Sequence, residues 1–110
     1  MLKTDFKVYR LGPIAAFDSS AHSVHQILMS AYFAKYGIDS YIYLRNLRPT
    51  KGKKELSSFI GIKFQDKLHV RLSSKHKGLS SLQNFINLVK DLRRNRKFTN
   101  WVFLSKADHL

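Results

Sequence analysis

The sequence predicts an α/β domain in three layers, with a mostly parallel sheet and crossover helices in the order β-α-β-α-β-α-β. Short β-rich runs alternate with runs of helical periodicity along the chain. The β-rich runs are nearly continuous in apolar residues, as in strands buried on both faces. With 110 residues, 44% of them hydrophobic, the chain can bury one modest core, so we expect residues 1–110 to form a single domain.

The first strand is predicted over 5–11, DFKVYRL, where apolar and basic side chains alternate. Gly12 and Pro13 end it, because Pro has no N–H to donate to a sheet. The small and turn-prone residues of 14–20 then form a loop.

The first helix is expected to begin after an N-cap at Ser19 or Ser20 and to end at Gly37, a residue suited to a left-handed C′ position. Apolar residues at helical spacing form one stripe: Val24, Ile27, Leu28, Ala31 and Ala34. Four further residues widen it: Met29, Tyr32, Phe33 and Tyr36. We therefore expect this helix to be covered on more than one side.

The middle of the chain predicts two more strands around a short helix. Residues 40–46 form a strand buried on both faces, and 47–54 form a basic loop. Residues 55–62 form one or two helical turns that end at Gly61. The run 63–72 alternates imperfectly and carries Lys, His and Arg, which is typical of an edge strand.

A second long helix is the clearest element in the sequence, with Ser80 or Ser81 as its expected cap. Its apolar stripe is expected to pack in the core: Leu79, Leu82, Phe85, Ile86, Val89 and Leu92. An apolar strand, Trp101–Leu104, follows it.

This order of elements is Rossmann-like, and in such sheets ligands bind at the carboxyl ends of the strands, where the strand order switches. The loops at that edge are 12–23, the residues from Arg45 onward, and 105–106. The first loop has neither G-x-G-x-x-G nor a Walker A sequence. It instead leads into a helix N-terminus rich in serine and histidine, which either holds an anion or sugar hydroxyl or serves only to cap the helix.

Metal binding and triad catalysis have little support. His22 and His25 share a helix face, but no carboxylate or further His accompanies them, so we expect no metal and no cofactor. No Ser-His-Asp triad can be argued from residues that are merely neighbours in sequence.

Charge is the dominant property of the composition. Twenty Lys and Arg against seven Asp and Glu give a net charge of +13. Residues 51–110 carry most of it, which attracts nucleic acid, anionic lipid or phosphorylated substrates, unless it is simply a solvated face. The expected anionic surface-binding residues are Lys90, Arg93, Arg94, Arg96 and Lys97. They lack the interleaved aromatic residues of an RRM.

The sequence contains no Cys, which excludes a disulfide framework and fits a reducing compartment. The N-terminus has no apolar h-region, and no apolar run approaches the ~20 residues of a membrane span. We therefore expect a cytoplasmic protein, with docking on the inner face of a membrane as an option for its basic surface.

Three stretches resemble the N-terminal domain of GT-B fold glycosyltransferases. Residues 19–46, with the turn AYFAKYGIDSYIYL, match that family's first helix, glycine turn and second strand. Residues 55–74 are similar to its short helix and third strand, and 82–110 to its next helix and fourth strand. The sequence GPIAAFDSS replaces the family's usual Gly-Gly loop, and Lys106 stands where the family often has Arg.

The resemblance implies the acceptor-side portion of an enzyme that moves a sugar from a nucleotide-sugar donor to a glycan or lipid-linked acceptor. It implies no metal, a donor site in a second domain, and no activity of this fragment alone. The implied acceptor-binding residues are Gly12, Ser19, Ser20, His22, Ser23 and Lys106. Two other hypotheses remain open: a small basic nucleic-acid-binding α/β module, and a domain with a structural or protein-binding role.

Overall fold

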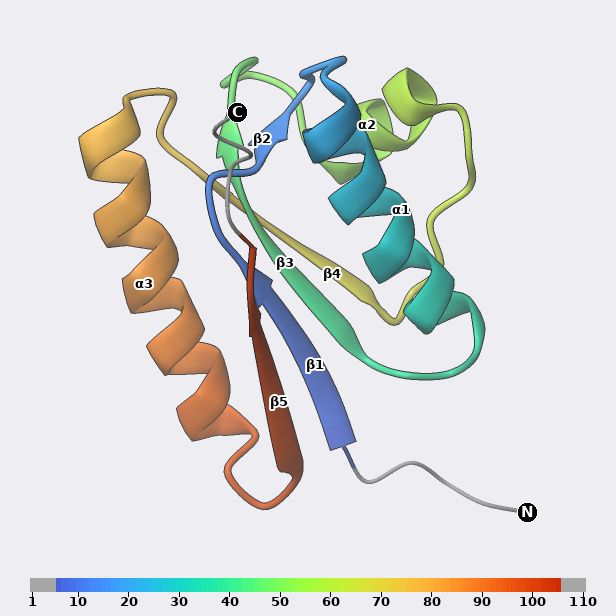
Figure 1. Cartoon of the computed structure of the whole chain (residues 1–110), viewed down its shortest axis with the longest axis vertical. Helices are drawn as coiled ribbons and strands as arrows, with labels where there is room; N and C mark the ends of the chain where they lie inside the picture. Colours follow the sequence, from blue (N-terminus) through green and yellow to red (C-terminus); the bar gives the residue numbers. More distant parts are fainter. Residues whose placement is uncertain (1–5, 106–110) are drawn as a thin grey trace.

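Every strand pairing in the structure is parallel, as the alternation of strands and helices predicts. The computed structural model describes residues 6–105 (Figure 1). The elements are β1 (Phe6–Leu11), β2 (Ala15–Ala16), α1 (Ala21–Lys35), β3 (Ser40–Asn46), α2 (Lys53–Ile60), β4 (Leu68–Ser73), α3 (Lys77–Arg94) and β5 (Thr99–Leu104).

The register places β1 at the middle of the sheet. Ser40 of β3 pairs with Val8 of β1 and with Leu68 of β4, so these two strands lie on opposite edges of β3. β5 pairs with the other edge of β1 along its whole length. The short β2 continues along β3 beyond the end of β1. The order β4-β3-β1-β5, with helices on both faces, is a Rossmann-like three-layer fold.

One face of the sheet is covered by α1 and α2 and has an apolar core (Figure 1). Its central side chains are completely buried: Ile27, Ile42, Leu44, Leu56 and Leu68. The prediction that residues 40–46 form a strand buried on both faces is confirmed.

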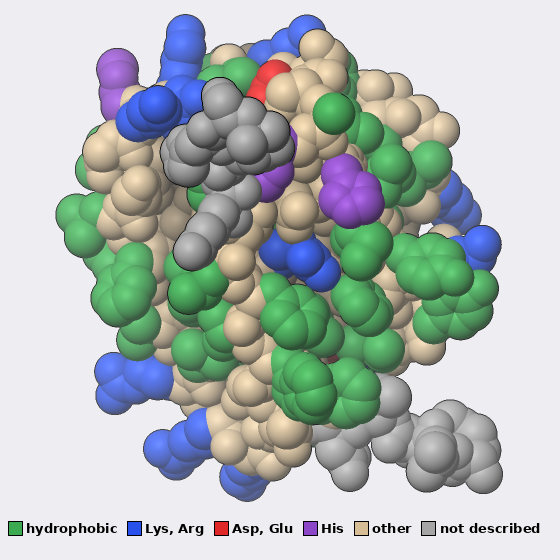
Figure 2. Space-filling model, in the orientation of Figure 1, with side chains coloured by type: hydrophobic (Ala, Val, Ile, Leu, Met, Phe, Trp, Pro, Cys, Tyr) green, Lys and Arg blue, Asp and Glu red, His purple; other side chains and the backbone are tan. Residues whose placement is uncertain are grey.

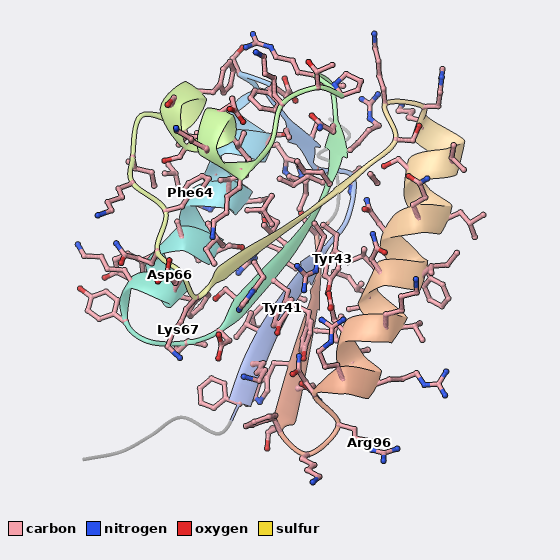
Figure 3. The ribbon with its side chains drawn as sticks, turned by 180° about the vertical axis from the view of Figure 1, so that it is seen from behind. Tyr41, Tyr43, Phe64, Asp66, Lys67 and Arg96 are labelled. Atoms are coloured by element: carbon pink, nitrogen blue, oxygen red, sulfur yellow. The ribbon has the colours of Figure 1, made fainter. Side chains whose placement is uncertain are left out.

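The other face is covered by α3 and is built from tyrosines. Tyr9, Tyr41 and Tyr43 lie on this face with Leu88, and Figure 3 shows Tyr41 and Tyr43 between the sheet and α3. The Tyr43 hydroxyl donates to the Asp91 carboxylate over 2.7 Å, and the side-chain amide of Asn95 donates to the other two hydroxyls. Burial raises the pKa of Tyr9 to about 12. Burial and the nearby Asp91 carboxylate raise the pKa of Tyr43 as well.

These hydroxyls reverse the expected orientation of α3. Its buried residues are Ser80, Asn84, Leu88 and Asp91, whereas Leu79, Leu82, Phe85 and Ile86 are exposed. The prediction that the apolar stripe packs in the core is wrong for these four. Of the other two predicted residues, Val89 is half-buried and Leu92 packs against the tyrosine cluster. The reason is that the tyrosine hydroxyls and Arg71 need polar partners from the helix above them.

The start of α3 also differs from the prediction. The N-cap is His76, four residues before the expected serine. Ser80 lies inside the helix, where its hydroxyl is 2.6 Å from that of Ser73 in the preceding strand. The serine is therefore a contact with the sheet and not a cap.

α1 is covered on one side only. Its buried positions include Ser23 and Ser30 together with Ile27, Ala31 and Ala34. The expectation that α1 is covered on more than one side is wrong, because Leu28, Met29 and Tyr32 of the helix are exposed, as is Tyr36 at its C-cap. Small residues face the sheet because they allow the helix to approach it closely.

The remaining elements are the short helix α2, the short strand β2 and the two edge strands. α2 begins at Lys53, two residues earlier than expected, and ends at the left-handed Gly61 as predicted. The expected loop after β1 contains the two-residue strand β2. β4 and β5 are both edge strands, and Trp101 and Leu104 of β5 are exposed.

The buried Asp91 carboxylate generates a stability prediction. Its oxygens also accept two hydrogen bonds from the Arg71 guanidinium, at 3.0 and 3.1 Å, so Asp91→Ala leaves two groups without their partner. We expect a loss of about 2–4 kcal/mol in the free energy of unfolding, measured by urea denaturation. Arg94→Ala removes an exposed partner of the same carboxylate and should cost less than about 1 kcal/mol. Equal losses in the two variants would contradict the prediction.

The carboxylate of Asp39 makes the stability of the fold depend on pH. Burial raises the pKa of this carboxyl, but hydrogen bonds from Lys7 and His69 outweigh burial and hold the pKa at about 2. A depressed folded-state pKa stabilises the fold above the unfolded value of 3.8 and loses that contribution as the pH falls toward 2. The stability difference between wild type and Asp39→Asn should therefore shrink between about pH 5 and pH 2. A difference that stays constant over that range would contradict this assignment.

Candidate functional site

The carboxyl ends of β1 and β5 meet at the point where the chain changes faces. After β1 the chain enters α1 on one face of the sheet, whereas β5 is reached from α3 on the other face (Figure 1). The Ser105 amide donates to the Leu11 carbonyl over 2.7 Å. Parallel α/β sheets bind ligands at such a switch point. We call Gly12, His22 and Ser105 the switch-point site.

Gly12 is required by close packing at this site. A Cβ atom at Gly12 would lie 2.3 Å from the Ser105 carbonyl oxygen and 2.8 Å from the Ser105 Cβ. No real Cβ fits there, so the glycine lets the two strand ends approach.

His22 joins the site from the first turn of α1. Its Nε2 lies 3.3 Å from the Ser105 hydroxyl, and its side chain is half-buried. Residues 12, 22 and 105 thus come together although they are far apart in sequence. An imidazole and a hydroxyl can bind sugar hydroxyls or an anion.

The serines of the predicted site belong to a network around Asp18. The hydroxyls of Ser20 and Ser23 both donate to the Asp18 carboxylate, and the Ser20 hydroxyl accepts from the Ser23 amide as the N-cap. The Ser20 hydrogen bond is the main reason that the pKa of Asp18 is lowered. Ser23 is buried and also accepts from the Ala15 amide. Each hydroxyl already donates its proton to Asp18, so these two serines can only accept a hydrogen bond from a ligand.

Two predicted residues stand apart from this network. Ser19 is exposed and precedes the cap. Lys106 lies outside the described residues.

Arg10 is the residue that sequence reasoning missed. It is only 8% exposed, and its guanidinium donates to the Ser30 hydroxyl and the Gln26 amide oxygen. Burial lowers the pKa of Arg10, and none of the carboxylates of residues 6–105 forms an ion pair with it. Gln26 lies one helical turn after His22, so the buried cation adjoins the switch-point site. In the sequence, Arg10 is one of the basic residues of an alternating strand, and nothing in that pattern indicated that it would be buried.

An aromatic cluster of β1 and β5 begins beside Arg10. The Arg10 guanidinium lies 5.3 Å from the Phe103 ring, and Phe103 adjoins Trp101, which contacts Phe6. Figure 2 shows hydrophobic side chains gathered over β5 and the adjoining side of α1, on the face of the sheet that α1 only partly covers.

The predicted basic cluster is divided by the structure. Lys90 lines an open cleft of about 740 Å³ at the carboxyl ends of β3 and β4, together with Lys51, Lys75 and His76. Arg94 pairs with Asp91. The side chains of Arg93, in the last turn of α3, and of Arg96 and Lys97, just after the helix, are exposed. Figure 3 shows Arg96 at the opposite end of the sheet from the switch point.

Within residues 6–105, no cluster of three or more His, Asp or Glu side chains is arranged to hold a metal ion. Nor does any helix of this part combine the length and the apolar character needed to span a membrane. No protein-family model, curated protein or solved structure matches the chain.

Gly12→Ala tests the close approach of the two strand ends. The new methyl group would collide with backbone atoms of Ser105, so we expect a loss of roughly 2 kcal/mol or more in the free energy of unfolding. Gly78→Ala is the matched control, because a Cβ there has open space and alanine favours a helix. That control should stabilise the protein by up to about 1 kcal/mol. A neutral Gly12→Ala would show that the strand ends are farther apart.

Proposed function

We propose that the chain is the acceptor-side portion of a glycosyltransferase that moves a sugar from a nucleotide-sugar donor to a glycan or lipid-linked acceptor. The observation that carries the proposal is the switch-point site, where Gly12 allows β5 to approach β1 and His22 reaches Ser105. This is the edge of the fold where an α/β domain holds its ligand. The resemblance of residues 19–46 to GT-B enzymes supports the same assignment.

The roles of the site residues follow from their chemistry. His22 and Ser105 offer a ring nitrogen and a hydroxyl for acceptor hydroxyls, and the serines beside Asp18 offer acceptor atoms. The buried Arg10 supplies positive potential to an acceptor that carries phosphate, and low dielectric strengthens that potential. The donor would be held by a second domain, and a metal is not part of this proposal.

A second candidate is binding of nucleic acid by the C-terminal end of α3. The exposed side chains of Arg93, Arg96 and Lys97 favour it, because they lie away from the switch-point site and suit contacts to phosphates. Such binding would weaken steeply with salt.

The proposals are separated by amide shifts in ¹⁵N-labelled protein titrated with maltotriose, a short-chain prenyl pyrophosphoryl sugar and a DNA duplex. We expect one of the sugar probes to shift Gly12, His22 and Ser105. His22→Ala should lower the affinity for that probe about tenfold, the effect of one lost hydrogen bond. His25 is exposed, and His25→Ala should leave the affinity unchanged.

Three outcomes would count against the transferase proposal. Neither sugar probe shifts the switch-point amides; the two histidine variants weaken binding equally; or the 110-residue chain alone transfers sugar from a nucleotide-sugar donor. Shifts by DNA confined to Arg93, Arg96 and Lys97 would favour the second candidate.

A further inference from the structure

The side of α3 that faces away from the sheet is apolar. Leu79, Leu82, Phe85 and Ile86 have exposed fractions of 48%, 56%, 58% and 42%. Their spacing places them on one side of the helix, opposite the buried residues. We call these four residues the outer stripe. A contiguous exposed apolar surface of this kind marks an interaction site, whereas scattered single residues would not.

Hydrogen bonds hold the outer stripe in this orientation. Ser80 contacts Ser73, and Asp91 binds Tyr43 and Arg71. A rotation of α3 that buried the stripe would break these contacts and leave polar groups buried without partners. The stripe is therefore displayed by the fold itself.

The charges beside the outer stripe are all positive. Lys90, Arg93 and Arg94 lie toward the C-terminal end of the stripe, and the single acidic residue of α3, Asp91, is buried. The other acidic residues of 6–105 lie outside α3. Asp18 precedes α1 and Asp39 follows it, Glu55 is in α2, and Asp66 lies between α2 and β4. Figure 3 shows Asp66 on the far side of the sheet from α3.

A basic cleft adjoins the same face. Ile86 and Lys90 line the cleft of about 740 Å³ that also contains Lys75 and His76. Ile86 belongs to both the outer stripe and the cleft, so apolar surface and cationic surface are continuous there.

An apolar stripe with only basic residues beside it is a poor surface for binding a second copy of the chain. Two such faces would bring Lys and Arg of one copy against Lys and Arg of the other, with no exposed carboxylate on α3 to offset the repulsion. An anionic surface meets the opposite condition, since its charge complements the basic residues while its apolar interior receives the stripe.

We propose that the outer face of α3 docks on an anionic lipid bilayer. Its 18 residues give a helix of about 27 Å, which Figure 1 shows alone on its side of the sheet and so able to lie along a flat surface. The outer stripe enters the boundary between headgroups and acyl chains, and Lys75, Lys90 and Arg93 lie at the level of the phosphates. The inference does not rest on the proposed function, because no residue of the switch-point site takes part in it.

Sedimentation with vesicles tests the proposal. We expect the protein to bind vesicles of phosphatidylcholine that contain about 30% phosphatidylglycerol, since this anionic fraction gives a clear surface potential. It should not bind vesicles of phosphatidylcholine alone. The double variant Leu82→Asn/Phe85→Asn should lower the partition coefficient at least about tenfold. The matched control is Leu28→Asn/Tyr32→Asn on α1, where Tyr32 has the same 58% exposure as Phe85; this control should bind like wild type.

A fluorescence measurement identifies the face that enters the bilayer. The chain has one Trp, Trp101, whose ring contacts Phe6 and Phe103 on the opposite face of the sheet from α3. Anionic vesicles should leave the emission of Trp101 unchanged. They should shift the emission of Trp101→Phe/Phe85→Trp to the blue.

Any of four results would overturn the proposal. Wild type fails to bind anionic vesicles; it binds neutral vesicles equally well; the α3 variant retains wild-type binding; or only Trp101 shifts. Sedimentation equilibrium supplies the remaining outcome: a dimer that Leu82→Asn/Phe85→Asn dissociates, without vesicle binding, would assign the face to self-association. Both variants replace exposed residues, so unfolding by urea should confirm that they fold.

Discussion

The buried carboxylate of Asp91 determines how α3 lies on the sheet. It accepts hydrogen bonds from Tyr43 of β3 and from Arg71 of β4, and so joins the helix to two strands. The desolvation of a carboxylate is costly unless it is paired and hydrogen-bonded, and this one has both kinds of partner. Asn95 repeats the arrangement at the end of the helix through Tyr9 and Tyr41. One layer of the fold is therefore oriented by polar contacts.

The two faces of the sheet consequently differ in what holds them. The face under α1 and α2 depends on burial of Ile, Leu and Ala side chains, which is favourable but not directional. The face under α3 has tyrosine rings whose hydroxyls must find partners, which makes the rotation of the helix specific. The cost is that α3 leaves Leu, Phe and Ile side chains in water. A surface of this composition has a physical use only where another apolar phase or partner covers it.

The switch-point site combines a steric and an electrostatic requirement. Gly12 removes the Cβ that would keep β5 from approaching β1, and this proximity brings Ser105 to His22. Arg10, which adjoins the site, remains buried with only neutral hydrogen-bond partners among the described residues. A buried cation without a paired carboxylate is costly, and an anionic ligand nearby would offset part of that cost. Asp18, in contrast, is fully engaged by serines and serves the start of α1.

Local pattern was sufficient for most of the architecture. The order of strands and helices, the parallel sheet, the doubly buried β3 and the end of α2 at Gly61 follow from periodicity, apolar runs and a glycine signal. The same reasoning located the edge that holds Gly12, His22 and Ser105, because parallel strands place their carboxyl ends together. It failed where the partner of a side chain comes from a distant segment.

The outer stripe shows why. Helical periodicity reveals that α3 has an apolar side, but it does not reveal whether the surface beneath the helix is apolar or polar. That surface comes from Tyr9, Tyr43 and Arg71, which are brought together only when the sheet forms. Arg10 was missed for the same reason, since its burial depends on Gln26 and Ser30 of a helix packed over it. The sequence by itself determined which elements form and in what order; only the tertiary structure decided which sides of them are buried, because hydrogen bonds between distant segments outweighed the apolar pattern.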